Sequence, residues 1–241
     1  MRAVTIPKCR IIPLLIILVT ALATAAAADT YVRPTLRELT HSKGQNKAVV
    51  GIIEGIQGVS YVHRARKSGR TDTFLGLRLF EGDRVSSDKS RVHVRYKDGT
   101  YVEMGAESSL EVERLRFKPA NPLPENAAAN QYDETVFRFS QGLVRISAAD
   151  VHVLSQFTIK TTNAILKVTG PSDFYMIQLP NERELTVRVV RGKVEVINVV
   201  TNEKLAVPPG TGAFVKVSGL VTHAGAFTTE QFDFLKSRTS I

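Results

Sequence analysis

From Val49 to Val217, apolar and polar residues alternate in short runs separated by turn-forming pairs such as Asp-Gly, Gln-Gly and Pro-Gly. A period of two is typical of strands that bury one face and expose the other. Strand and turn together recur about every 8–12 residues, which is the spacing found in sandwiches and barrels. The pattern therefore predicts an all-β domain of stacked or sandwiched sheets, built as a β-sandwich, a roll or a short β-solenoid.

The clearest single element is a hairpin over residues 91–104, with an Asp98-Gly99 pair between two alternating runs. Asp-Gly in this position is a strong hairpin signal, because both residues tolerate the positive φ of a type I′ turn. Three apolar residues of the first strand share one parity, so we expect them to face the core. These residues are Val92, Val94 and Tyr96.

Two segments depart from the strand pattern. Residues 118–132 carry three prolines, which central strands exclude, so we expect a surface loop there. Near the C-terminus, Thr228 and Gln231 fit a capping box, and Phe227 with Phe232 fits a hydrophobic staple. We therefore expect a short C-terminal helix that covers one end of the sheets.

The N-terminal segment has the layout of a secretory signal peptide. Residues 1–10 carry basic but no acidic side chains, and the uncharged run 11–28 passes from large apolar residues to alanines. That order is typical of a signal peptide with a small-residue cleavage site. We expect cleavage after Ala28, with cuts after Ala25 or Ala27 as alternatives. An uncleaved membrane anchor is the competing interpretation, because the run reaches the lower length limit of a spanning helix.

These patterns predict four parts. They are a signal peptide (1–28), a lead-in arm (29–48), a β domain (49–217, with the loop 118–132) and a tail with a short helix (218–241). The expected location is the periplasm or the extracellular space. Cys9 is the only cysteine and precedes the apolar run, so we expect no lipoprotein and no disulfide.

The charge favours acidic partners. The net charge is +9, and removing the three basic residues of the signal segment leaves +6. An envelope protein, an anionic polysaccharide or a lipid headgroup fits this excess, whereas nucleic acid is not expected outside the cytoplasm. A strand over the first half of the hairpin would project four basic side chains from one face. This predicted interaction face comprises Arg91, His93, Arg95 and Lys97, with an ordinary solvated face as the alternative.

The sequence carries no motif of known catalytic chemistry. No two of the five histidines are three or four residues apart, and neither H-E-x-x-H nor G-x-S-x-G is present. We therefore expect no metal, no cofactor, no catalytic residue and no enzyme activity. An enzyme acting on envelope glycan is the alternative, and it would need two carboxylates about 5–10 Å apart. The candidates for that pair are Asp133, Glu134 and Asp173.

Several turn and strand motifs occur in an order and spacing that resembles the FecR-domain family, named for the periplasmic regulator of iron-citrate signalling. The resemblance covers about residues 49–217. The motifs are Gly82-Asp83-Arg84-Val85, residues 90–100, 108–119, 142–147 and 157–164, Arg191-Gly192, residues 194–196 and Pro209-Gly210. The chain departs from the family pattern at Thr162, where the family has a proline, and in the stretch 166–171.

The resemblance implies an exported, non-catalytic domain that binds another envelope component, in cell-surface signalling or in envelope assembly. The family's sigma-factor regulators place a domain in the cytoplasm before their membrane span, and this chain has ten residues before its apolar run. We therefore expect a stand-alone exported member. A membrane-anchored regulator is the alternative if the signal segment is not cleaved, and an assembly factor that acts through a sheet edge is another.

Overall fold

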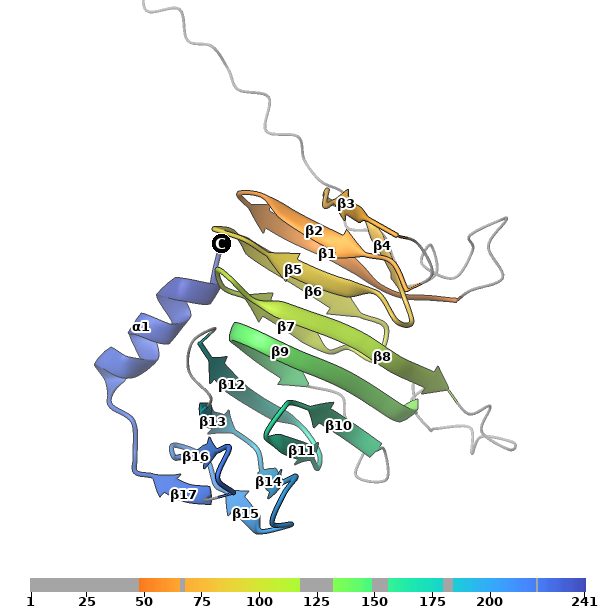
Figure 1. Ribbon diagram of the computed structural model, residues 1–241. Helices are drawn as coiled ribbons and strands as arrows, with labels where there is room; N and C mark the ends of the chain where they lie inside the picture. Colours follow the sequence, from red (N-terminus) through yellow and green to blue (C-terminus); the bar gives the residue numbers. More distant parts are fainter. Residues whose placement is uncertain (1–47, 66–67, 118–131, 149–155, 180–183, 220) are drawn as a thin grey trace, which may run out of the picture. The chain divides into compact units, whose positions relative to one another are not determined.

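The computed structural model describes residues 48–65, 68–117, 132–148, 156–179, 184–219 and 221–241 (Figure 1). The predicted signal segment lies outside these residues, as do all but the last residue of the lead-in arm and all but the last residue of the predicted loop 118–132. That last loop residue, Tyr132, is the first residue of a strand. The described strands form two sheets, and β9 (Tyr132–Ala148) belongs to both. No described helix is long and apolar enough to cross a membrane.

Sheet A is antiparallel between all of its neighbouring strands. Its order is β4 (Arg78–Phe80), β1 (Val49–Gln57), β6 (Arg91–Tyr96), β7 (Tyr101–Met104), β9, β12 (Ser172–Gln178), β13 (Glu184–Arg191), β16 (Gly212–Lys216) and β17 (Val221–Ala224). β17 extends this sheet past Val217, the expected limit of the β domain.

Sheet B has the same plan and contains one parallel pair, β9 with β10. Its order is β3 (Arg70–Asp72), β2 (Ser60–His63), β5 (Arg84–Ser87), β8 (Ser109–Phe117), β9, β10 (Gln156–Lys160), β11 (Ala164–Val168), β14 (Val194–Asn198) and β15 (Lys204–Val207).

The two sheets pack face to face around one continuous apolar core. Tyr96 of sheet A and Phe137 of sheet B meet there edge to face, with ring centroids 4.8 Å apart. The core contains Val92 and Val94 as well, so the predicted inward parity of β6 is confirmed. The expected all-β architecture of sandwiched sheets with a short C-terminal helix is likewise confirmed.

The hairpin between β6 and β7 is confirmed, but its turn differs from the predicted type I′ turn. Tyr96 and Thr100 are joined by a hydrogen bond from the Tyr96 N–H to the Thr100 carbonyl, 2.8 Å long. The loop between them therefore has three residues, and among these Gly99 takes a positive φ of 79° whereas Asp98 does not. A three-residue loop with a glycine at its end is the next most common hairpin connection.

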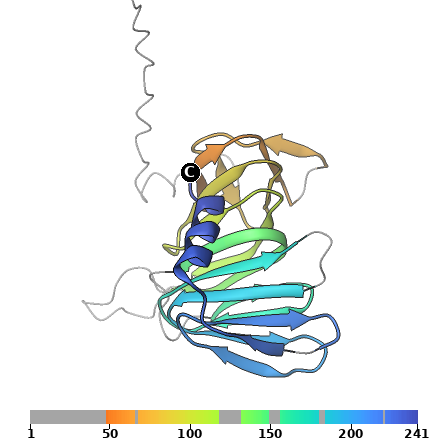
Figure 2. The ribbon, with the colours of Figure 1, turned by 90° about the vertical axis from the view of Figure 1, so that its left-hand side faces the viewer.

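The C-terminal helix α1 (Thr229–Thr239) begins as its sequence predicts. The Thr228 hydroxyl accepts from the Gln231 N–H at 3.3 Å, and the Gln231 side chain accepts from the Thr228 N–H at 3.2 Å. Phe227 stacks on Phe232 with ring centroids 6.3 Å apart, which completes the staple. The helix runs across strands of sheet A on the face that is turned away from sheet B, called the outer face below (Figure 2).

Candidate functional site: the polar face beneath the C-terminal helix

The outer face of sheet A carries an aligned row of polar side chains. Because strand residues alternate between faces, those flanking the core residues of β6, β7, β9 and β12 all project outward. The register places His93 opposite Glu103, Glu103 opposite Arg145, and Arg145 opposite Tyr175. Four strands thus contribute one row of side chains that runs perpendicular to the strands.

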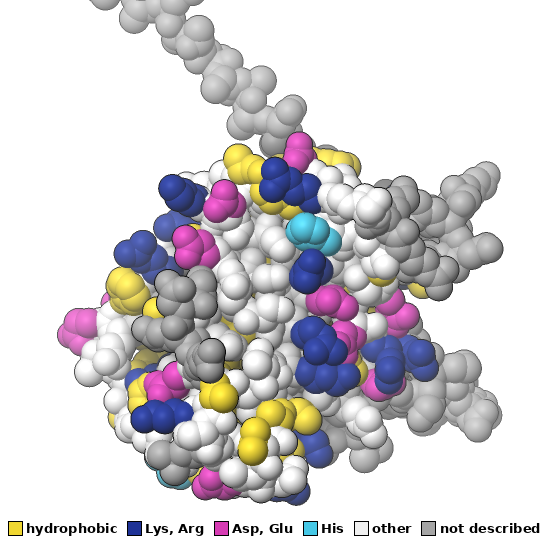
Figure 3. Space-filling model, viewed as in Figure 1, with side chains coloured by type: hydrophobic (Ala, Val, Ile, Leu, Met, Phe, Trp, Pro, Cys, Tyr) yellow, Lys and Arg dark blue, Asp and Glu magenta, His cyan; other side chains and the backbone are white. Residues whose placement is uncertain are grey.

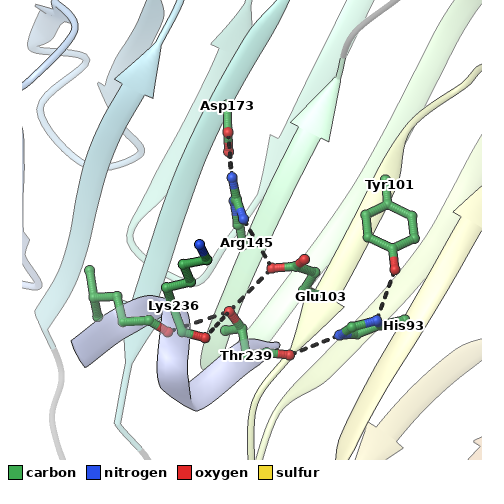
Figure 4. A network of polar contacts seen from close by, with 8 residues as sticks. His93, Tyr101, Glu103, Arg145, Asp173, Lys236 and Thr239 are labelled. Atoms are coloured by element: carbon green, nitrogen blue, oxygen red, sulfur yellow. Dashed lines mark hydrogen bonds and ion pairs between the residues drawn. The ribbon is translucent and has the colours of Figure 1, made fainter. Parts of the chain in front are cut away.

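Arg145 is the centre of this row (Figure 4). Its guanidinium donates to both carboxylate oxygens of Asp173, at 3.0 Å from Nε and 2.7 Å from Nη2. It also donates from Nη1 to Glu103 Oε2 at 3.3 Å. The hydrogen bonds to Asp173 raise the pKa of Arg145 above its usual value, although burial opposes this shift. Arg145 is therefore a permanent cation that holds two carboxylates.

The end of α1 is attached to the same row. The Thr239 hydroxyl lies 3.3 Å from Glu103 Oε2, and the Thr239 carbonyl accepts from His93 Nε2 at 2.9 Å. The Tyr101 hydroxyl lies 2.8 Å from His93 Nδ1. Since a carbonyl oxygen can only accept, Nε2 carries the proton, and in the neutral ring Nδ1 accepts from Tyr101. We call His93, Tyr101, Glu103, Arg145, Asp173 and Thr239 the helix-anchoring network.

Aromatic contacts close the space between the helix and the sheet. The Tyr175 ring is buried, with the Arg145 guanidinium 5.6 Å from its centroid and Phe232 of α1 at 6.1 Å. Burial raises the pKa of the Tyr175 hydroxyl, a shift that the charge of Arg145 opposes. The helix thus covers the network with apolar as well as polar contacts.

The predicted interaction face is largely occupied by contacts within the chain. Arg91 donates from Nη1 to the Ser240 carbonyl at 3.0 Å and to Gln57 Oε1 at 3.2 Å. Arg95 forms an ion pair with Glu54, with 2.7 Å between Nε and Oε1. Together with the bond from His93 to Thr239, these contacts engage three of the four predicted residues within the chain, and Arg91 and His93 meet the C-terminal end of α1.

Lys97, the fourth predicted residue, lies outside strand β6, so strand alternation does not determine which face its side chain occupies. It follows β6, lies in the three-residue hairpin loop and is 9% exposed. Burial lowers the pKa of its ammonium group. The loop breaks the alternation on which the prediction relied, so strand parity does not apply beyond Tyr96.

The carboxylates considered for glycan chemistry are ion-paired where their side chains are described. Asp173 is bound by Arg145 in sheet A, and Glu134 is bound by Arg114 in sheet B. The side chain of Asp133 lies outside the described residues. Among the described residues, no group of three His, Cys, Asp or Glu side chains has the spacing to hold a metal ion. The network's printed ion pairs join strands of sheet A, and its hydrogen bonds to Thr239 attach the end of α1.

Sequence reasoning missed most of the helix-anchoring network. Asp173 was considered for a different role, and Arg145 and Thr239 were not singled out. A signal for Arg145 was present, since it lies in an alternating run between the buried residues Val144 and Ile146. The contact from His93 to Thr239 spans 146 residues, so no local pattern could have indicated it.

Comparisons with known proteins find a family match for the central part of the chain. Residues 83–195 match the family model described as FecR protein. Two crystal structures, at 2.50 and 1.65 Å resolution, show a similar protein from Parabacteroides distasonis ATCC 8503 that is provisionally assigned as an anti-sigma factor. For each, the identity is 18%, the TM-score is 0.49, and the match covers 64% of either chain.

This chain thus spans less than two thirds of the length of that protein. Comparison with curated proteins gives no match. The matched segment begins just before β5, contains the β6–β7 hairpin and β9, and ends within β14. Residues 83–195, just under half of the chain, thus match the FecR family, which confirms the resemblance that the sequence motifs indicate.

Proposed function

We propose that this chain is an exported, non-catalytic FecR-type domain that binds another protein of the cell envelope as part of a regulatory signalling system. The observation that carries the proposal is the FecR match over the centre of the sandwich, residues 83–195. Export is supported by the signal-peptide pattern of residues 1–28.

A protein is a better partner than an anionic polymer because the predicted basic row is already engaged. Arg95 is neutralised by Glu54, and His93 and Arg91 donate to backbone carbonyls at the end of α1. Figure 3 shows basic and acidic side chains interspersed over one face of the molecule. A long polyanion needs a continuous positive surface. The contacts of Arg91, His93 and Arg95 within the chain leave no such surface along the predicted row.

The open end of the two sheets formed by β15 and β17 suits a protein partner. Edge strands present backbone N–H and C=O groups that can pair with an added strand. The adjoining turns carry three exposed apolar side chains, Val199, Val200 and Val217. The Thr201 hydroxyl donates to the Gly219 carbonyl at 3.2 Å, which holds the two turns together. Exposed apolar side chains gathered in this way are typical of interaction sites.

The test is capture of partners from an envelope fraction with the tagged mature protein. Val200 is 67% exposed at this end, and Val59 is 58% exposed in the β1–β2 turn. Val200→Asp is expected to lose the captured protein, whereas the matched control Val59→Asp should retain it. Equal capture by both variants would show that the partner binds a surface other than the end formed by β15 and β17. Release of reducing ends from envelope glycan by the wild-type protein would contradict a non-catalytic function.

A further inference from the structure

A pocket of about 350 Å³ lies between sheet A and the N-terminal half of α1. It is separate from the helix-anchoring network, which attaches the other end of the helix. The sheet contributes Ile177, Thr186 and Arg188, and the helix side contributes Phe227, Phe234 and Leu235. Pockets of this size with apolar walls and few polar groups are typical of small-molecule sites.

Arg188 is the cation of this pocket, and its surroundings are unusual for an arginine. Its guanidinium lies 5.5 Å from the Phe214 ring centroid and 5.9 Å from that of Phe227. Nη1 donates to the Gly225 carbonyl at 2.9 Å, and none of the described carboxylates forms an ion pair with Arg188. Burial lowers the pKa of this guanidinium. A partly desolvated cation with unused donors is stabilised by an anion.

Glu230, the acidic residue at the pocket, is not the anionic partner of Arg188. Glu230 lines the mouth but is fully exposed, and its carboxylate is engaged by Thr228 at the start of the helix. The planar fork of an arginine binds a carboxylate through two parallel hydrogen bonds. A ligand therefore needs a carboxylate to meet Arg188 and an apolar body to lie along the aromatic wall.

We propose that this pocket binds a free alkyl carboxylate of medium chain length, with its carboxylate on Arg188 and its chain against Phe227 and Phe234. The volume suits a chain of roughly ten carbons. Each methylene that becomes buried strengthens binding by up to about fourfold, so affinity should rise from hexanoate to decanoate. The proposal is independent of the envelope partner and of the sheet end that binds it.

The experiment is a calorimetric titration of the mature protein with decanoate, kept below its micellar concentration. Decan-1-ol has the same chain without the charge, and we expect it to bind at least about tenfold more weakly. Arg188→Gln should weaken decanoate binding by about tenfold, while Arg191→Gln, an exposed arginine on the same strand, should not. Equal affinity for the acid and the alcohol would overturn the proposal.

A second pair of variants tests the pocket without changing Arg188, in case the Arg188→Gln protein misfolds. Phe234 and Phe74 are 56% and 58% exposed, so changing either to Ser should leave the fold intact. Phe234→Ser is expected to bind decanoate several-fold more weakly and Phe74→Ser to bind it normally. Unchanged binding in Phe234→Ser would exclude this pocket. Tighter binding of acetyl-leucyl-leucine than of decanoate would also overturn the proposal, because the pocket would then take a peptide carboxyl terminus.

Discussion

Val94 lies in the core between the two sheets and is 0% exposed, whereas its chain neighbours His93 and Arg95 lie on the outer face. A carboxylate at this position would be buried without a partner, since the surrounding side chains are apolar. Val94→Asp is therefore expected to lower the free energy of unfolding by about 3 to 5 kcal/mol. Urea denaturation followed by circular dichroism measures this loss.

The same change at an exposed valine provides the control. Val59→Asp should alter the free energy of unfolding by no more than about 0.5 kcal/mol, because Val59 is largely exposed in the β1–β2 turn. A Val94→Asp protein as stable as this control would show that the core assignment of β6 is wrong.

Asp98, in the hairpin loop, is the buried carboxylate with the clearest pH consequence. Its oxygens accept from the Thr100 N–H at 3.0 Å and from the Thr135 hydroxyl at 2.9 Å. Burial nevertheless raises the pKa of Asp98 above its usual 3.8. The folded protein thus holds this proton more tightly than the unfolded chain does, and its contribution to stability falls as pH rises from 3.8 through the raised pKa.

Asp98→Asn removes this charge and keeps a side chain that suits the loop. Thr135 can accept from the new amide, while the amide oxygen accepts from Thr100. We expect the variant to be at least as stable as the wild type at about pH 7. Its stability should also lack the decrease with rising pH that ionisation of Asp98 causes in the wild type. Chemical denaturation at several pH values measures this. A loss of about 1 kcal/mol or more at neutral pH would mean that the ionised form is the stabilised one.

Within a strand, the alternation of side chains made it possible to predict which single residues face the core. Val92 and Val94 were assigned to the core correctly, and each pairs with a strand of the same sheet on both sides. Tyr96, also assigned correctly, pairs with β1. Strand parity does not determine the direction of Lys97, because this residue lies in the three-residue loop that replaces the expected tight turn. Whether an outward side chain meets solvent or α1 depends on contacts between residues far apart in the sequence, such as His93 and Thr239. Strand parity does not encode such contacts.

At the scale of elements, helix α1 shows how much a local capping signal contributes to the stability of a helix. The capping box satisfies backbone donors of its first turn, and substitution of an N-cap threonine by alanine typically costs about 1 kcal/mol. Thr228→Ala should therefore speed amide hydrogen exchange in α1 by about fivefold and leave exchange in β9 unchanged. Thr229→Ala, an exposed neighbour inside the helix, is the control. Equal exchange in both variants would mean that the helix-anchoring network alone holds the helix.

Elements were predictable to the extent that their signals are local. The hairpin and the helix start depend on residues within about five positions of each other, and both were placed correctly. The order of strands in the two sheets depends on pairings such as β1 with β6 and β11 with β14. Those pairings join separate segments whose alternation looks alike, so the sequence predicted sandwiched sheets without their order.

At the scale of the whole molecule, the proposed function depends first on the predicted export. A signal peptide that is cleaved after Ala28 would leave a mature chain that begins at Asp29. Mass spectrometry of protein from the periplasmic fraction is expected to find an N-terminus within about three residues of Asp29. Full-length protein retained in the inner membrane would instead support the anchor interpretation.

The shared strand β9 also determines the order in which this domain can assemble. In the described part of the chain, strands β1 to β8 pair only among themselves or with β9. Strands β10 to β17 likewise pair only among themselves or with β9. The first half can therefore order as soon as β9 emerges, and β9 then serves as a template for β10 and β12. Helix α1 follows β17 in the chain and attaches to β6 and β7, on the earlier side of β9. The earlier half therefore offers its attachment site for α1 before the helix that uses it is in place.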